Sequence, residues 1–157
     1  MSKLKREILT GEALEKTTSA LQATLYDLVD LALQGKQAHW NVIGRNFRSV
    51  HLELDEIIAL VREGSDSVAE RISTLGVAPD GRAGGVANTS RLEAYPEGLQ
   101  SAEATVSAYS DRLAKAIEGL RSAIEAVGDH DSVSEDLLIG ISADLEKQLW
   151  MMQAQEA

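Results

Sequence analysis

The sequence predicts an all-α fold, a four-helix bundle with one long crossover between its second and third helices. Four long stretches carry apolar residues at alternating spacings of three and four, which is typical of amphipathic helices. The 157 residues are 44% hydrophobic and include only two prolines, so one domain can bury a core with few helix breakers. Both prolines fall in one irregular stretch, residues 76–98, which is longer than two antiparallel neighbours need.

After a short N-terminal tail, residues 1–10, the first helix is expected from about Gly11 to Trp40. A turn at 41–46 follows, in which Gly44 supplies backbone freedom, and the second helix is expected from about Phe47 to Leu75. The faces expected to be buried are Leu21, Leu25, Leu28, Ala32, Gly35 and His39 on the first helix, and Val50, Leu54, Ile57, Ile58 and Val61 on the second.

The crossover is expected to hold a short helix near Ser90–Glu93. The third helix is predicted from about Ser101 to Val127, with an apolar stripe at Val106, Tyr109, Leu113, Ile117, Leu120 and Ile124. Ser132 and Glu135 have the spacing of a capping box, which would begin a fourth helix that ends near Met152. Two helices, a long crossover and two more helices make a ferritin-like bundle, and we expect residues 1–157 to form this single domain.

Composition limits the chemistry. The chain has no cysteine, so any metal must be bound by His, Asp or Glu. No apolar run is long enough to span a membrane and the N-terminal residues lack the pattern of a secretory signal, so the cytoplasm is the expected compartment, with nucleoid association as an option. The net charge of −10 favours cations over nucleic acid as partners, although solubility alone is the simpler explanation of acidity.

Candidate metal ligands gather on the second helix. His51 and Asp55 lie four residues apart, as do Asp66 and Glu70, and the four fall on one stripe. His39 lies on the apolar face of the first helix near its end. A single histidine or carboxylate pair is usually structural or solvated, whereas this combination indicates a metal site. Mixed His and carboxylate ligands suit Fe(II), Mn(II) or Zn(II), and carboxylates stabilise Fe(III), which favours a ferroxidase.

The spacing also restricts how such a site is built. The midpoints of the two pairs are 15 residues apart, or about 22 Å along a helix, so one metal ion cannot contact both pairs of one chain. Either two unrelated half-sites exist, or a second subunit completes each site. A twofold dimer with antiparallel second helices would place His51 and Asp55 beside Asp66 and Glu70 of its partner, with the dyad between Leu60 and Val61.

These motifs resemble those of the Dps family (DNA-binding protein from starved cells). The resemblance covers nearly the whole chain and rests on Lys36-Gln-Ala-His-Trp-Asn41, on His51-x3-Asp55-x10-Asp66-x3-Glu70, and on Asp144-Leu-Glu-Lys-Gln-Leu-Trp150. It implies a homo-dodecameric shell that oxidises Fe(II), with hydrogen peroxide as the oxidant, and stores ferric iron, which protects DNA under oxidative stress. It also implies that His39, His51 and Asp55 come from one subunit, and Asp66 and Glu70 from its neighbour.

The resemblance extends to residues around the site. Trp40 would lie beside it and intercept oxidising equivalents, with core packing as the alternative. Acidic residues line iron-entry pores in such shells, and Asp136 is the first candidate and Asp131 the second, with a solvated acidic turn as the alternative.

The family's long lysine-rich tails are missing from this sequence. Only Lys3, Lys5 and Arg6 are basic near the N-terminus, and residues 153–157 carry no positive charge, so we expect weak or absent DNA binding. Two other functions remain open, a DNA-compacting stress protein with incidental iron binding, and a metal-dependent hydrolase. The short basic tail argues against the first, and no substrate pocket is evident for the second.

Overall fold

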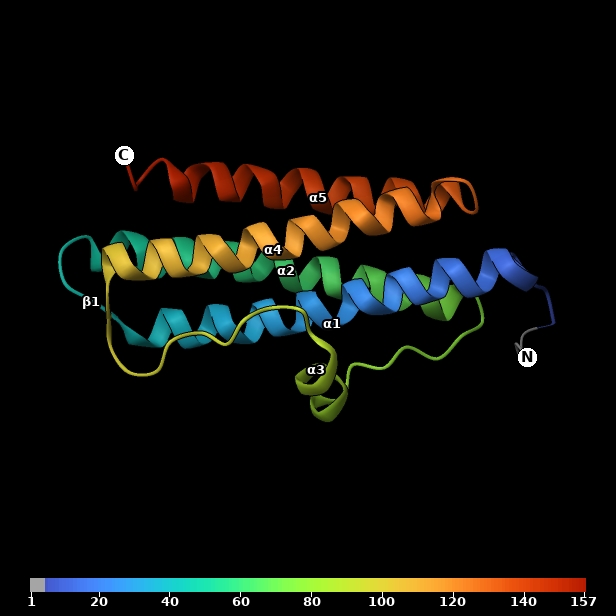
Figure 1. The fold of residues 1–157 in the computed structure, drawn as a ribbon, viewed down its shortest axis with the longest axis horizontal. Helices are drawn as coiled ribbons and strands as arrows, with labels where there is room; N and C mark the ends of the chain where they lie inside the picture. The colour runs from blue at the N-terminus through green and yellow to red at the C-terminus, as the bar shows by residue number, and fades with distance from the viewer. Residues whose placement is uncertain (1–4) are drawn as a thin grey trace.

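The computed structural model describes residues 5–157 and contains four long helices, one short helix and two short strands (Figure 1). Residues 1–4 of the predicted tail, and with them Lys3, lie outside the described residues. The long helices are α1 (Gly11–Asn41), α2 (Phe47–Thr74), α4 (Ala102–Gly128) and α5 (Ser132–Gln153). Their limits agree with the predicted ones to within one residue.

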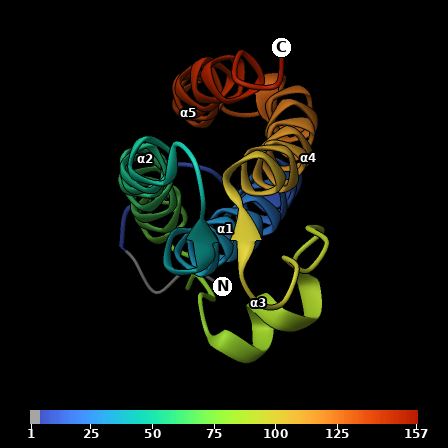
Figure 2. The ribbon, with the colours of Figure 1, turned by 90° about the vertical axis from the view of Figure 1, so that its left-hand side faces the viewer.

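The four long helices surround a common core, while the crossover runs outside the bundle (Figure 2). The residues predicted to face inward are buried, except Ile124, which is only partly buried, and each large aliphatic one contributes about 1.5–3 kcal/mol. The buried ones are Leu21, Leu25, Leu28 and Ala32 on α1, Val50, Leu54, Ile57, Ile58 and Val61 on α2, and Val106, Tyr109, Leu113, Ile117 and Leu120 on α4. Leu138 and Leu145 of α5 are buried against the same core. The prediction of an all-α, ferritin-like bundle is therefore confirmed.

α1 packs closely against α2 and α4 at Gly35. A Cβ atom at this position would lie 2.7 Å from Ile58 Cγ1 and 2.7 Å from the hydroxyl of Tyr109. Tyr109 is fully buried and donates its hydrogen bond to the carbonyl of Leu31 at 3.2 Å. The missing side chain thus lets α1 pack directly against α2 and α4.

The crossover contains a short helix, as expected, but at a different place. This helix, α3, spans Ala83–Thr89 and ends before the predicted segment at Ser90–Glu93. The reason is that two carboxylates of α1 bind the chain there. The backbone N–H of Arg91 donates to Asp27 at 3.0 Å, and the hydroxyl of Ser90 donates to Asp30 at 2.5 Å. The backbone at Arg91 is therefore held to α1 and leaves the helix.

The start of α5 also differs from the prediction. Asp131, and not Ser132, is the N-cap, and its carboxylate accepts the backbone N–H of Ser134 at 3.3 Å. Asp131 is held there by the guanidinium of Arg71 at 2.7 Å. The predicted capping box is therefore wrong, because a buried ion pair to α2 fixes the cap one residue earlier.

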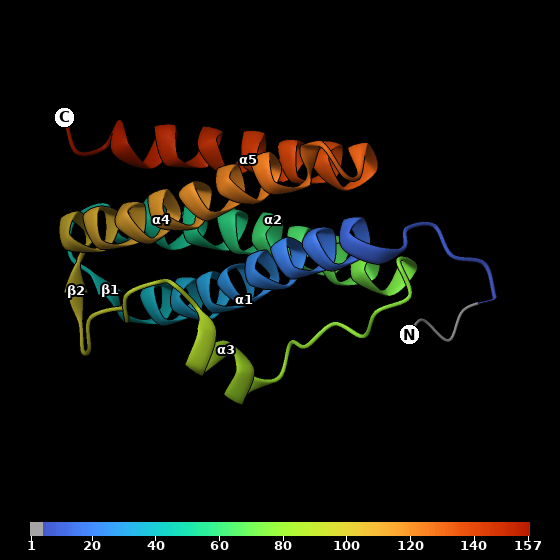
Figure 3. The ribbon, with the colours of Figure 1, turned by 45° about the vertical axis from the view of Figure 1, so that its right-hand side comes forward.

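Two short strands tie the connections together at one end of the bundle (Figure 3). β1 (Val42–Ile43) directly follows α1, and β2 (Gln100–Ser101) directly precedes α4. They pair in parallel, with Val42 opposite Gln100 and Ile43 opposite Ser101. This pairing anchors the turn that joins α1 to α2, and so fixes the end of α1 beside the beginning of α2.

Candidate metal centre

Two histidines meet where α1 ends and α2 begins. The rings of His39 and His51 stack with their centroids 3.6 Å apart. Nδ1 of His39 lies 2.9 Å from the carbonyl oxygen of His51, and Nδ1 of His51 lies 2.9 Å from the carbonyl oxygen of His39. Side chains and backbone thus hold both imidazoles in a reciprocal pair.

The reciprocal hydrogen bonds define the tautomer of both rings. A carbonyl oxygen can only accept, so each Nδ1 must carry the proton. In the neutral ring the proton-free nitrogen is then Nε2, whose lone pair is available to a metal ion. A backbone carbonyl that holds the other ring nitrogen is the usual support of a metal-binding histidine. Both imidazoles can therefore bind a metal ion through Nε2.

Asp55 lies one turn after His51 on α2 and completes this cluster. Its carboxylate accepts a hydrogen bond from Nζ of Lys36 on α1, and Oδ1 lies 3.4 Å from Nδ1 of His39. The hydrogen bond from Lys36 holds the pKa of Asp55 below its usual value, although desolvation opposes the shift. The carboxylate is therefore ionised at neutral pH. We call His39, His51 and Asp55 the imidazole half-site.

Asp66 and Glu70 lie farther along the same helix and are exposed. We call them the acidic half-site. Because α2 is continuous from Phe47 to Thr74, the separation of about 22 Å expected from the helical rise applies. Within residues 5–157, no group of three or more His, Asp or Glu side chains is arranged to hold a metal ion. The described part of one subunit therefore carries two separate groups of candidate ligands and no complete metal site.

Three exposed apolar residues lie close in the sequence to His39 and His51. Trp40 is 69% exposed, Ile43 47% and Phe47 42%, and the ring of Phe47 lies 5.0 Å from that of His51. Core packing of Trp40 within the subunit is thus ruled out. Clustered apolar groups beside incomplete metal ligands are typical of a surface that another chain covers.

The two pore candidates differ in their surroundings. Asp136 is exposed on the first turns of α5, as a pore residue should be. Asp131 is 9% exposed and is bound to Arg71 and Ser134. Its carboxylate forms these contacts inside the subunit, which favours Asp136 over Asp131 as the pore candidate.

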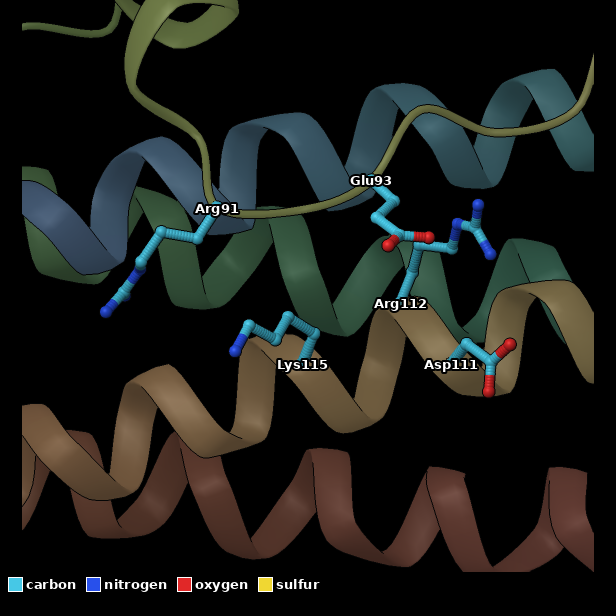
Figure 4. A pocket seen from close by; sticks show the side chains of 5 residues that line it. All are labelled: Arg91, Glu93, Asp111, Arg112 and Lys115. Carbon is cyan, nitrogen blue, oxygen red and sulfur yellow. The ribbon is translucent and has the colours of Figure 1, made fainter.

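The charged pocket in Figure 4 lies elsewhere, between the crossover and α4, and contains none of the predicted ligands. Each of its basic side chains already has a hydrogen-bond or ion-pair partner within the chain. Lys115 binds Glu118 at 2.8 Å, Arg91 binds Asp27, and Arg112 donates to the carbonyls of Ala94 and Ala108. Of these contacts, the one between Arg112 and Ala94 joins the crossover to α4, whereas Lys115 and Glu118 pair within α4 and Arg91 ties the crossover to α1.

Two residues beside the half-sites were missed by the sequence reasoning. Lys36 was noted only as part of a motif, although it lies one turn before His39 and so shares its face. Arg71 directly follows Glu70 but points toward α5. A basic residue next to predicted ligands was the available signal in both cases.

Comparison with known proteins supports one family. Residues 18–156 match the model of the ferritin-like domain. The chain is 41% identical to the "Fine tangled pili major subunit" of Haemophilus ducreyi over 86% of this chain and 71% of that protein. It is 37% identical to the "DNA protection during starvation protein" of Mycolicibacterium smegmatis over 93% of this chain and 80% of that protein.

A solved structure agrees closely with the fold. The tetragonal form of Mycobacterium smegmatis Dps superposes with a TM-score of 0.93 and 35% identity, and the match covers 99% of this chain and 94% of that one. Across residues 5–157, no helix combines the length and apolarity needed to cross a membrane.

Proposed function

Because the chain belongs to the Dps proteins of the ferritin-like family, we propose that it oxidises Fe(II) and stores the ferric product in a shell of identical subunits. Each site is formed at a twofold interface, where the acidic half-site of one subunit meets the imidazole half-site of its neighbour. His39, His51 and Asp55 come from one chain, and Asp66 and Glu70 from the other.

The observation that carries this proposal is the state of the imidazole half-site. Two imidazoles are held with Nε2 free, an ionised carboxylate lies beside them, and no further ligand among residues 5–157 of the same chain completes the group. The exposed apolar side chains of Trp40, Ile43 and Phe47 give a second copy an area to cover. An antiparallel partner supplies two carboxylates to each of two equal sites.

Fe(II) is the substrate of the proposed reaction. Imidazole and carboxylate oxygens bind Fe(II), and the carboxylates stabilise the Fe(III) product, which lowers the cost of oxidation. Two Fe(II) ions each lose one electron, and one molecule of hydrogen peroxide accepts both. Its O–O bond breaks, and two protons complete two water molecules. This stoichiometry consumes peroxide without releasing hydroxyl radicals.

The remaining parts of the proposal concern the shell. Twelve subunits enclose the ferric mineral, Asp136 lines the entry pores for Fe(II), and Trp40 intercepts oxidising equivalents that leave the site. The protein acts in the cytoplasm, where removal of Fe(II) and peroxide protects DNA during stress. The net charge of −10 per chain supports attraction of cations to the shell.

The proposal is tested by adding Fe(II) anaerobically, then hydrogen peroxide, while the absorbance of Fe(III) is followed. The wild type should show a rapid phase, which the double variant D66A/E70A should lose while native mass spectrometry finds the same assembly. The variant D129N/E125Q, on exposed positions of the α4 end, serves as a control for lost surface charge. Equal rates in all three proteins would contradict the proposal.

A further inference from the structure

A buried polar network joins the end of α2 to the start of α5, next to the acidic half-site. Arg71 on α2 donates from Nε to the hydroxyl of Ser134 at 3.0 Å and from a terminal nitrogen to Asp131 at 2.7 Å. The side chains of Arg71 and Asp131 are 12% and 7% exposed, and Ser134 is fully buried. Ser134 in turn donates its hydroxyl to Asp131, which closes the network into a ring.

Removing any member of this network would leave the others buried without their partners and would lower the stability of the fold. A guanidinium and a carboxylate both lose most of their hydration here, and good hydrogen-bond geometry is needed to compensate for that loss. Apolar residues of similar size would hold α2 and α5 together at a lower cost in desolvation. Unlike apolar packing, this hydrogen-bonded network fixes the rotation of α2 about its own axis. The planar guanidinium of Arg71 can donate to both acceptors only at one such rotation.

Rotation of α2 matters because Arg71 directly follows Glu70. Glu70 and Asp66 are exposed, and no hydrogen bond or ion pair of the described chain involves their carboxylates. Their direction therefore depends on the helix that carries them. A rotation of about 20° moves a carboxylate at the helix surface, about 6 Å from the axis, by about 2 Å. Metal–ligand distances tolerate only about 0.2 Å.

We propose that Arg71, through Asp131 and Ser134, is a positioning residue that orients the acidic half-site toward the neighbouring subunit's imidazoles. Arg71 itself contacts no metal ion. This inference rests on the proposed function, since it assigns to Arg71 a role in the same intersubunit site.

Equilibrium binding of Co(II), a spectroscopic substitute for Fe(II), tests this role in the assembled protein without turnover. The variant R71Q should bind Co(II) roughly tenfold more weakly, as loss of a supporting contact to a metal ligand typically does, and should change the visible absorption of the bound ion. The variant I72V, at the adjacent buried position of α2, is the matched control. It lowers stability without touching the network, so its Co(II) affinity and spectrum should remain those of the wild type.

A second variant keeps the test valid if R71Q does not assemble. S134A removes one acceptor of Arg71 but leaves its ion pair, and should weaken Co(II) binding less than R71Q. Wild-type affinity and spectrum in assembled R71Q, or in S134A when R71Q fails to assemble, would overturn the inference. If E70A also binds Co(II) like the wild type, the intersubunit site itself is wrong. If E70A loses binding while R71Q and S134A do not, only the role of Arg71 is refuted.

Discussion

Complementation between two inactive variants gives a quantitative prediction of the intersubunit site. H51A removes a ligand from the imidazole half-site, and E70A removes one from the acidic half-site. An uninterrupted α2 keeps the two halves about 22 Å apart in one chain, so each homodimer of either variant has two damaged sites. A mixed dimer has one intact site, with His51 from the E70A chain and Glu70 from the H51A chain, and one site damaged on both sides.

The expected yield follows from random pairing. Co-expression of the two chains in equal amounts makes about half of the dimers mixed, and half of their sites intact, so about a quarter of wild-type sites should be present. The amplitude of rapid Fe(II) oxidation by peroxide in the co-expressed assembly measures this fraction, with each variant alone as the control. An amplitude no higher than that of the separate variants would refute the shared site, provided that mass spectrometry confirms mixed assemblies.

Four further predictions concern packing, charge and DNA. G35A should destabilise the fold by about 1–3 kcal/mol in denaturant unfolding, because its Cβ meets buried atoms at 2.7 Å, whereas G140A, which meets nothing within 4 Å, should not. K36M should strengthen Co(II) binding roughly fivefold, the equivalent of about 1 kcal/mol. The substitution removes the ammonium group that forms an ion pair with Asp55 and competes with the metal ion for its carboxylate. Desolvation raises the pKa of Asp131, but hydrogen bonds from Arg71 and Ser134 together outweigh it and hold the pKa below its usual value. The stability that the ionised Asp131 adds is therefore present above about pH 4 and lost as pH falls, so the difference in unfolding free energy between wild type and D131N should shrink on acidification. A gel-shift assay near 150 mM salt should find little DNA bound; tight retention would contradict the charge argument.

Much of the fold was predictable because it depends on periodicity within each helix. The apolar stripes ending at His39 and beginning at Val50 placed the helices and their buried faces correctly. The errors arose where distant groups compete with local signals. The backbone at Arg91 hydrogen-bonds to Asp27, 64 residues away in the chain, and this contact displaces the predicted helix. The sequence around Arg91 gives no sign of a hydrogen-bond partner so far away in the chain.

The site was predictable only in part for a related reason. Ligand types and the spacing of four residues predict both half-sites, and helical rise implies that one chain cannot join them. The reciprocal hydrogen bonds of His39 and His51 depend on the turn between α1 and α2, and therefore required the structure. The hydrogen bond from Lys36 to Asp55 also depends on the packing of α1 against α2.

The most direct test of the shared metal site is a crystal structure of the assembled protein soaked anaerobically with Fe(II), with iron located by anomalous scattering. We predict iron bound by His51 and Asp55 of one subunit and by Glu70 of its twofold neighbour. Iron bound by the residues of one chain alone, or the acidic half-site of every neighbour lying far from His51, would contradict the account.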